Sequence, residues 1–205
     1  MRIFRAAISR RFLFVLIAMT AVLILFFFPA FKDEPEISVI IGEPWIDMQR
    51  RSTAEIADVL PDTYWYQMPR TDARLRLADR EYGFVTPLAR FFIVAFTPTG
   101  TVRNVRLSPQ IEPLLLEDTM QVLLGLQDQW RRSGWQPTRA DEFPVFEDTP
   151  EWRAALRENG KIATYWIAGD QYEIQLYADR FDYSKRPDEE RYLITMQLSR
   201  PLRID

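Results

Sequence analysis

The sequence predicts an α+β domain that follows one membrane-spanning helix. An uncharged apolar run near the N-terminus is long enough to cross a bilayer, and segments with helical periodicity lie between runs of strand-forming residues. Short turns join the predicted strands, which indicates antiparallel pairing. We therefore expect one transmembrane helix and then a single domain, in which two or three helices pack on an antiparallel sheet made of the hairpin 89–108 and three C-terminal strands.

The apolar run covers residues 12–31, FLFVLIAMTAVLILFFFPAF, and contains no charged side chain. A helix of this length spans about 30 Å, the thickness of the hydrocarbon core of a bilayer. Basic flanks stay on the cytoplasmic side, so we expect a cytoplasmic tail (1–11), a transmembrane helix (12–31) and an exported domain (32–205). The residues that set this orientation are Arg2, Arg5, Arg10 and Arg11.

A cleaved signal peptide is the main alternative for this segment, and a buried core helix and an Arg-rich organelle presequence are two others. The apolar region of a signal peptide is usually shorter and is followed by a small-x-small cleavage site. Here the run ends in Phe28-Pro29-Ala30-Phe31, a poor cleavage site, so we prefer an uncleaved anchor. Arginine outnumbers lysine 23 to 3, which is typical of a GC-rich bacterial genome. The expected location is therefore the bacterial inner membrane, with the C-terminal domain in the periplasm.

The first part of the exported domain is expected to contain a strand at 37–41, because these residues are apolar and β-branched. Pro44 suits the first position of a helix that continues to near Pro61. Residues 64–68 predict a short strand. Residues 69–88 mix charges with glycine and proline and predict mostly irregular structure, in which short pieces of helix or strand are the alternative.

The middle of the chain contains the clearest hairpin, with strands at 89–96 and 101–108 around a Thr-Pro-Thr-Gly turn. A helix is predicted at 113–133, because acidic residues near its start and arginines at its end complement the helix dipole. Gly134 suits the position that ends this helix.

An acidic connector is predicted at 136–148, before a helix that begins with Thr149 and Pro150 as its capping residues. Three strands then close the chain, and a highly charged loop joins the last two of them. The predicted strands are 162–167, 171–178 and 192–198.

Composition excludes several kinds of chemistry. The chain has no cysteine and no histidine, so it has no disulfide, no thiol nucleophile, no Ser-His-Asp triad and no ordinary zinc or haem site. Neither a phosphate-binding glycine loop nor a Gly-x-Ser-x-Gly motif occurs, and no cofactor is expected. Beyond residue 32 the chain has 21 basic and 29 acidic residues, a net charge of −8, which argues against nucleic acid and favours a basic protein partner.

Three consecutive aromatic residues, Tyr64, Trp65 and Tyr66, are the candidate partner-binding residues. Successive side chains of a strand point to opposite faces, so at least one of the three should point away from the core. Tyrosine and tryptophan are favoured anchors at protein interfaces. The alternative is a strand buried on both faces, or a tyrosine whose hydroxyl group reaches solvent.

The connector also contains a carboxylate cluster that could bind Ca²⁺ or provide the acid and base of a glycosidase. Its spacing does not match an EF-hand loop, and a solvated loop is the preferred interpretation. The acidic residues of this cluster are Asp141, Glu142, Glu147 and Asp148.

These observations favour a single-pass periplasmic protein with a non-enzymatic protein-binding domain, in contact with lipid through residues 12–31. It would be an accessory subunit of an envelope complex or an immunity-type protein. The alternative is an envelope enzyme that uses carboxylates, such as a glycan hydrolase, which needs two acids about 5–10 Å apart across a cleft. A third interpretation is that the apolar helix itself mediates association. The apolar run contains no Gly-x-x-x-Gly motif, which argues against this function.

Overall fold

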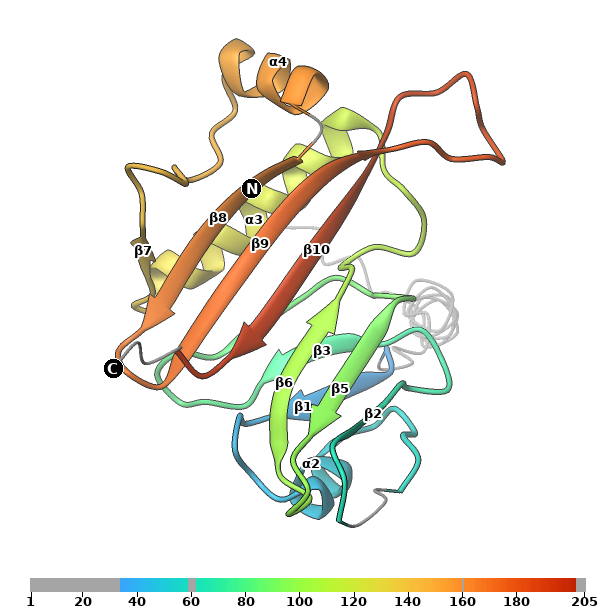
Figure 1. The fold of residues 1–205 in the computed structure, drawn as a ribbon, viewed down its shortest axis with the longest axis vertical. Coiled ribbons are helices and arrows are strands. Elements are labelled where there is room, and N and C mark those ends of the chain that lie inside the picture. The colour runs from blue at the N-terminus through green and yellow to red at the C-terminus, as the bar shows by residue number, and fades with distance from the viewer. Residues whose placement is uncertain (1–33, 59–61, 160, 202–205) are drawn as a thin grey trace, which may run out of the picture. The chain divides into compact units, whose positions relative to one another are not determined.

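A large antiparallel sheet dominates the computed structural model, which describes residues 34–58, 62–159 and 161–201 (Figure 1). Every neighbouring pair in this sheet is antiparallel. Its seven strands, in order across the sheet, are β2 (Trp65–Gln67), β5 (Phe92–Phe96), β6 (Val102–Leu107), β10 (Arg191–Ser199), β9 (Tyr172–Phe181), β8 (Lys161–Ala168) and β7 (Gln136–Thr138).

A second sheet has three strands, in the order β1 (Glu36–Val39), β3 (Arg74–Leu77) and β4 (Phe84–Val85). β1 and β3 are parallel, whereas β3 and β4 are antiparallel. Both β3 and β4 lie in the segment 69–88, for which mostly irregular structure was predicted. The rest of this segment lies outside strands and helices, so that prediction holds for most of it, but the two short strands were not located. The alternation in β3 is short, with Leu75 and Leu77 buried, and its pairing partner β1 is distant in sequence.

The helices of the described residues are α2 (Trp45–Arg51), α3 (Leu116–Arg132) and α4 (Pro150–Asn159). α3 contacts β10, and α4 contacts β8 and β9. In Figure 1, α3 lies behind the strands β8 to β10. The prediction of a single α+β domain with helices on an antiparallel sheet is therefore confirmed for the described residues, except that α2 contacts β1 of the smaller sheet.

α2 is much shorter than predicted: its last residue is Arg51, with Ser52 as the C-cap, whereas the helix was predicted to continue to near Pro61. The chain leaves the helix because the residues after it bond to β1. The backbone N–H of Ser38 donates to Ser52 Oγ at 3.0 Å, and the N–H of Thr53 donates to the carbonyl of Glu36 at 2.9 Å. These bonds replace the next helical turn, and Pro44 lies at the N-cap.

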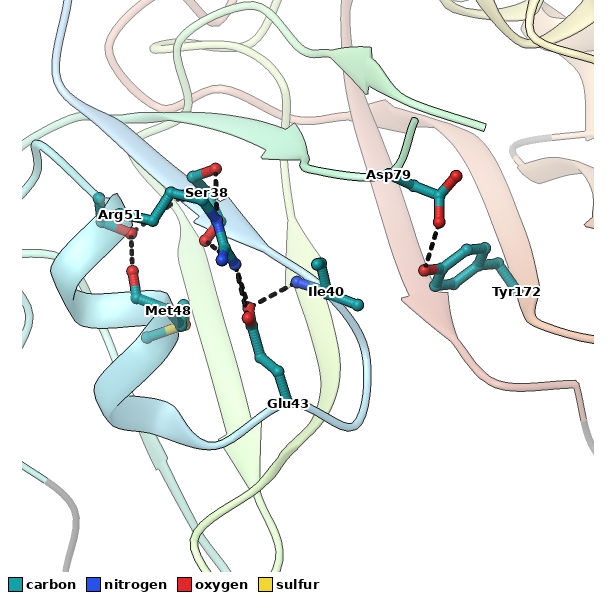
Figure 2. A network of polar contacts seen from close by, with 8 residues as sticks. Ser38, Ile40, Glu43, Met48, Arg51, Asp79 and Tyr172 are labelled. Carbon is teal, nitrogen blue, oxygen red and sulfur yellow. Dashed lines mark hydrogen bonds and ion pairs between the residues drawn. The ribbon is translucent and has the colours of Figure 1, made fainter. Parts of the chain in front are cut away.

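Figure 2 shows an ion pair that fixes α2 against β1. Glu43 has a side chain only 9% exposed, and its carboxylate accepts hydrogen bonds from Arg51 at 2.5 and 2.6 Å. The same carboxylate accepts a bond of 2.6 Å from the backbone N–H of Ile40, and Arg51 Nε donates to Ser38 Oγ at 3.2 Å. Both charges of this partly buried pair are therefore satisfied by close partners.

Aromatic side chains join α3, β4, β8 and β9 in the core. The rings of Trp130 and Trp166 lie 5.6 Å apart, and those of Trp135 and Tyr172 lie 6.1 Å apart and stack. The indole N–H of Trp135 donates to the carbonyl of Tyr82 at 2.9 Å. This cluster explains why several tryptophans of the chain are structural rather than available to a partner.

Residues 1–33 lie outside the described part of the chain. The predicted tail (1–11), the transmembrane helix (12–31) and the orienting residues Arg2, Arg5, Arg10 and Arg11 therefore remain predictions. None of the helices in residues 34–201 that the structure describes combines the length and the hydropathy needed to cross a membrane.

Candidate functional site

The three predicted partner-binding residues lie at one edge of the seven-stranded sheet, in and beside β2. Trp65 is half-buried, with its ring centroid 6.0 Å from that of Phe96. Its neighbours Tyr64 and Tyr66 are 66% and 63% exposed. Alternation along the strand thus divides the predicted set, because Trp65 belongs to the core while the two tyrosines face solvent.

Further exposed side chains continue this surface. Met68 follows Tyr66 by two residues and is 43% exposed. Phe91 is 38% exposed and lies just before β5. It precedes Ala95 by four residues, so the two side chains lie on the same face of the strand, and Ala95 is the register partner of Tyr66. The guanidinium of Arg103 lies 5.3 Å from the ring centroid of Tyr64. We call these five residues, Tyr64, Tyr66, Met68, Phe91 and Arg103, the aromatic edge.

A hollow of about 670 Å³ lies at the other side of the same sheet, beside β8. This volume lies within the range of ligand-binding pockets, about 300–1,000 Å³. Four segments form its walls: the connector before α4, the first half of α4, β8 and β9. The lining residues are Glu142, Phe143, Pro144, Glu151, Trp152, Ala155, Lys161, Ile162, Ala163, Tyr165 and Tyr177.

Aromatic contacts hold the connector over β8. The ring of Phe143 lies 4.8 Å from that of Tyr165, and the guanidinium of Arg139 lies 4.9 Å from the Tyr165 ring centroid. Lys161 Nζ lies 4.4 Å from the ring centroid of Tyr177. The Tyr177 hydroxyl donates a bond of 2.7 Å to Gln175, and burial, together with this tyrosine's contact with Tyr165, raises its pKa.

Two carboxylates, Glu142 and Glu151, line the hollow. The pKa of Glu151 lies below its usual value, because its carboxylate accepts hydrogen bonds from its own backbone N–H and from the Thr149 hydroxyl. Glu151 is therefore ionised at neutral pH. Lys161 is an exposed cation at the start of β8, and Asp179 is its register partner on β9.

The acidic connector does not form one site. All four of its predicted acidic residues are exposed, and only Glu142 lines the hollow. Asp148 instead pairs with Arg153 at 2.7 Å, and this hydrogen bond lowers the pKa of Asp148. Over residues 34–58, 62–159 and 161–201, no three acidic side chains come together in a way that could hold a metal ion.

The sequence did not predict the hollow, because no local motif marks it. Its aromatic residues come from the connector, α4, β8 and β9, and each one fits an ordinary amphipathic pattern. The only local signal was the alternation in β8 and β9, which places Tyr165 and Tyr177 on the face opposite to buried Trp166 and Leu176. The fold is needed to bring these segments together.

No protein-family model matches the chain, and no curated protein and no solved structure matches it either.

Proposed function

We propose that the chain is a non-enzymatic, membrane-anchored protein of the bacterial envelope, and that its aromatic edge binds a protein partner. The observation that carries the proposal is the exposure of Tyr64 and Tyr66, next to exposed Met68 and Phe91. Tyrosine, phenylalanine, methionine and arginine are the residues enriched at protein interfaces. Single exposed apolar residues are common on proteins, but a group of them on one edge is typical of a binding surface.

The attachment of β2 to the core supports this role. Trp65 and its contact with Phe96 fix β2 against the core, so that the flanking tyrosines are held in place before a partner arrives. A tyrosine side chain loses little conformational entropy on binding, and preorganisation lowers the cost of binding further. Arg103, beside Tyr64, adds a cation that can pair with a partner carboxylate while its flat group packs on the ring.

The apolar run 12–31 and the arginines before it support the membrane anchor and the periplasmic placement of the domain. The net charge of −8 beyond residue 32 supports a basic partner, because opposite charges accelerate the encounter of two proteins. An accessory subunit of an envelope complex and an immunity-type protein both fit this description, and the identity of the captured partner separates them.

A glycan hydrolase remains the second candidate, because Glu142 and Glu151 line the same aromatic hollow. A glycosidase needs one carboxyl group with a raised pKa to act as the general acid. The pKa of Glu151 is lowered, which weighs against this role for Glu151. We expect purified full-length chain to release no more product from peptidoglycan than its Glu142→Gln and Glu151→Gln variants do.

A crosslinking pull-down from membranes tests the proposed function. The baits are the tagged full-length chain, its Tyr64→Ala/Tyr66→Ala double variant, and a Phe181→Ala control, which removes an exposed aromatic residue far along β9. We expect one dominant partner with the wild type and the control, and a loss of at least tenfold with the double variant. Equal recovery by all three baits would contradict binding at the aromatic edge.

A further inference from the structure

The geometry points to a second binding site: the hollow beside β8 accepts an extended peptide segment as an additional strand, with an apolar side chain in the hollow and a basic side chain near Glu142 and Glu151. This site lies at the opposite end of the strand order from the aromatic edge. It therefore does not depend on the proposed function of that edge.

The first argument is that β8 lacks a neighbour along half of its length. β7 pairs with residues 165–167 of β8, and no strand or bridge in the described residues pairs with 161–164 on the side away from β9. Backbone groups of a strand point alternately to its two sides, so two of these four residues direct N–H and C=O groups away from β9. Such an edge is a template for an added strand.

The second argument is that the hollow occupies the position of the missing strand. Ile162 belongs to one face of the sheet, whereas Lys161, Ala163 and Tyr165 belong to the other, and all four line the hollow. A space that touches both faces of a strand lies against its edge. After β7 the chain leaves the sheet as the connector and then forms α4. The hollow lies beside β8 at the position that a longer β7 would occupy.

The residues that line the hollow determine which side chains of an added peptide fit into it. A strand added next to β8 would place alternate residues on the two faces of the sheet. On one face they would meet the Ile162 side chain, and on the other the rings of Tyr165 and Tyr177. Trp152 and Ala155 of α4 complete the apolar lining, so an aliphatic or aromatic residue fills the hollow best.

The charges favour a basic peptide. Two carboxylates and one ammonium group line the hollow, and the ammonium group of Lys161 already lies over the ring of Tyr177. Glu142 is next to Phe143, whose ring packs on Tyr165. This carboxylate therefore lies near the end of the unpaired edge that adjoins Thr138, the last residue of β7. A lysine or arginine of the peptide would meet an acidic group there.

A glycan fits these walls less well. Sugars present many hydroxyl groups that need hydrogen-bond partners when they are buried, and apolar side chains form most of the lining. The hydroxyl of Tyr177 is already engaged with Gln175. Unpaired backbone groups beside an apolar hollow are better matched by a peptide strand.

Selection of random displayed heptapeptides against the full-length chain in detergent micelles tests the inference. The Ala155→Trp variant fills the hollow, and Ala154→Trp makes the same change at a neighbouring half-buried position of α4 that does not line it. Circular dichroism establishes that both variants fold. We expect the wild type and Ala154→Trp to enrich peptides with alternating apolar residues and a lysine or arginine, and Ala155→Trp to enrich none.

A selected peptide is then synthesised in two forms, with N-methyl groups on one or the other set of alternate amides. Only one set can donate to β8, so we expect that form to bind roughly tenfold more weakly while the other form retains affinity. Equal affinity of the two forms would overturn the added strand. The inference is also overturned if selection on the wild type enriches no peptide more strongly than selection on the Ala155→Trp variant does. Binding of N-acetylglucosamine oligomers in the hollow, without binding of peptides, would overturn it as well.

Discussion

The hydroxyl of Tyr172 donates a hydrogen bond of 3.0 Å to Asp79, although 93 residues separate the two in sequence (Figure 2). The other carboxylate oxygen of Asp79 accepts bonds of 2.9 Å from the backbone N–H groups of Glu81 and Tyr82. One carboxylate therefore closes the turn between β3 and β4 and connects it to β9. The smaller sheet and the seven-stranded sheet are held together at this point.

Removing this carboxylate should destabilise the domain. We expect Asp79→Ala to lower the free energy of unfolding by about 2–4 kcal/mol, because it leaves the donors of the turn and Tyr172 without their acceptor. Tyr172→Phe, which removes one bond, should cost about 1–2 kcal/mol. Urea denaturation followed by tryptophan fluorescence measures both values. Asp170→Ala, at an exposed position, is the control and should change stability by less than about 0.5 kcal/mol.

The effect of Asp79→Ala should also depend on pH. Burial acts to raise the pKa of Asp79, but hydrogen bonds from Tyr82, Glu81 and Tyr172 outweigh it, and the pKa is lowered overall. A group with a lowered folded-state pKa contributes stability above its unfolded value, about 3.9, and loses this contribution as the pH falls through the folded value. The difference between wild type and Asp79→Ala should therefore be constant near pH 7 and shrink below about pH 4. A difference that grows on acidification would contradict this account.

Gln127 should be essential for the placement of the connector. It is fully buried on α3, where Nε2 donates to the carbonyl of Phe146 and Oε1 accepts from the N–H of Phe146, both at 2.9 Å. Gln127→Ala leaves two buried backbone groups unsatisfied and should cost about 2–5 kcal/mol of unfolding free energy. Gln121→Ala, on the exposed face of the same helix, is the matched control. Equal stability of the two variants would show that Phe146 finds other partners.

The aromatic edge should be dispensable for folding. We expect Tyr64→Ala and Tyr66→Ala each to change the free energy of unfolding by less than about 0.5 kcal/mol, because both side chains are exposed. Trp65→Ala should cost about 2 kcal/mol or more, because it removes the contact with Phe96 and leaves a cavity. Urea denaturation of the three variants tests this division between core and surface. A loss from Tyr66→Ala as large as that from Trp65→Ala would place Tyr66 in the core.

Much of the fold could be predicted from local patterns. The hairpin β5–β6, the helix α3 and the last three strands each carry their own periodicity, turn residues or caps, and they appear close to the predicted positions. β3, β4 and β7 were missed because each is too short to show a period, and they form through pairing with other segments; the first three residues of the predicted connector 136–148 are β7. α2 was predicted too long because nothing in its own sequence shows that Ser52 and Thr53 bond to β1.

The candidate sites could likewise be predicted only where a local sequence pattern marks them. Alternation in a three-residue aromatic run was enough to predict that a residue at 64–66 would point away from the core, and Tyr64 and Tyr66 do so. The hollow could not be predicted, because its walls come from four segments that meet only in the folded domain. The carboxylates of the connector looked like one cluster in the sequence, yet Asp148 turns to Arg153 while Glu142 turns to the hollow.

The predicted topology can be tested because the chain has no native cysteine. Single cysteines are introduced by Ser9→Cys in the predicted tail and by Ser184→Cys in the exposed loop between β9 and β10. In bacterial spheroplasts, a membrane-impermeant maleimide should label the cysteine at 184 directly and the cysteine at 9 only after lysis. Labelling of position 9 in intact spheroplasts would contradict the proposed orientation, and loss of the N-terminal segment from the mature protein would contradict the uncleaved anchor.

Site-specific photocrosslinking tests the central claim most directly. A photoreactive phenylalanine analogue replaces Tyr66 at the aromatic edge or, as the matched control, Phe181, which is exposed elsewhere on the domain. The full-length chain is irradiated in its native membrane. The proposed function predicts one discrete crosslinked protein from position 66, absent from position 181 and lost when Tyr64→Ala is added. The same products from both positions, or none from position 66, would contradict a protein-binding role for this edge.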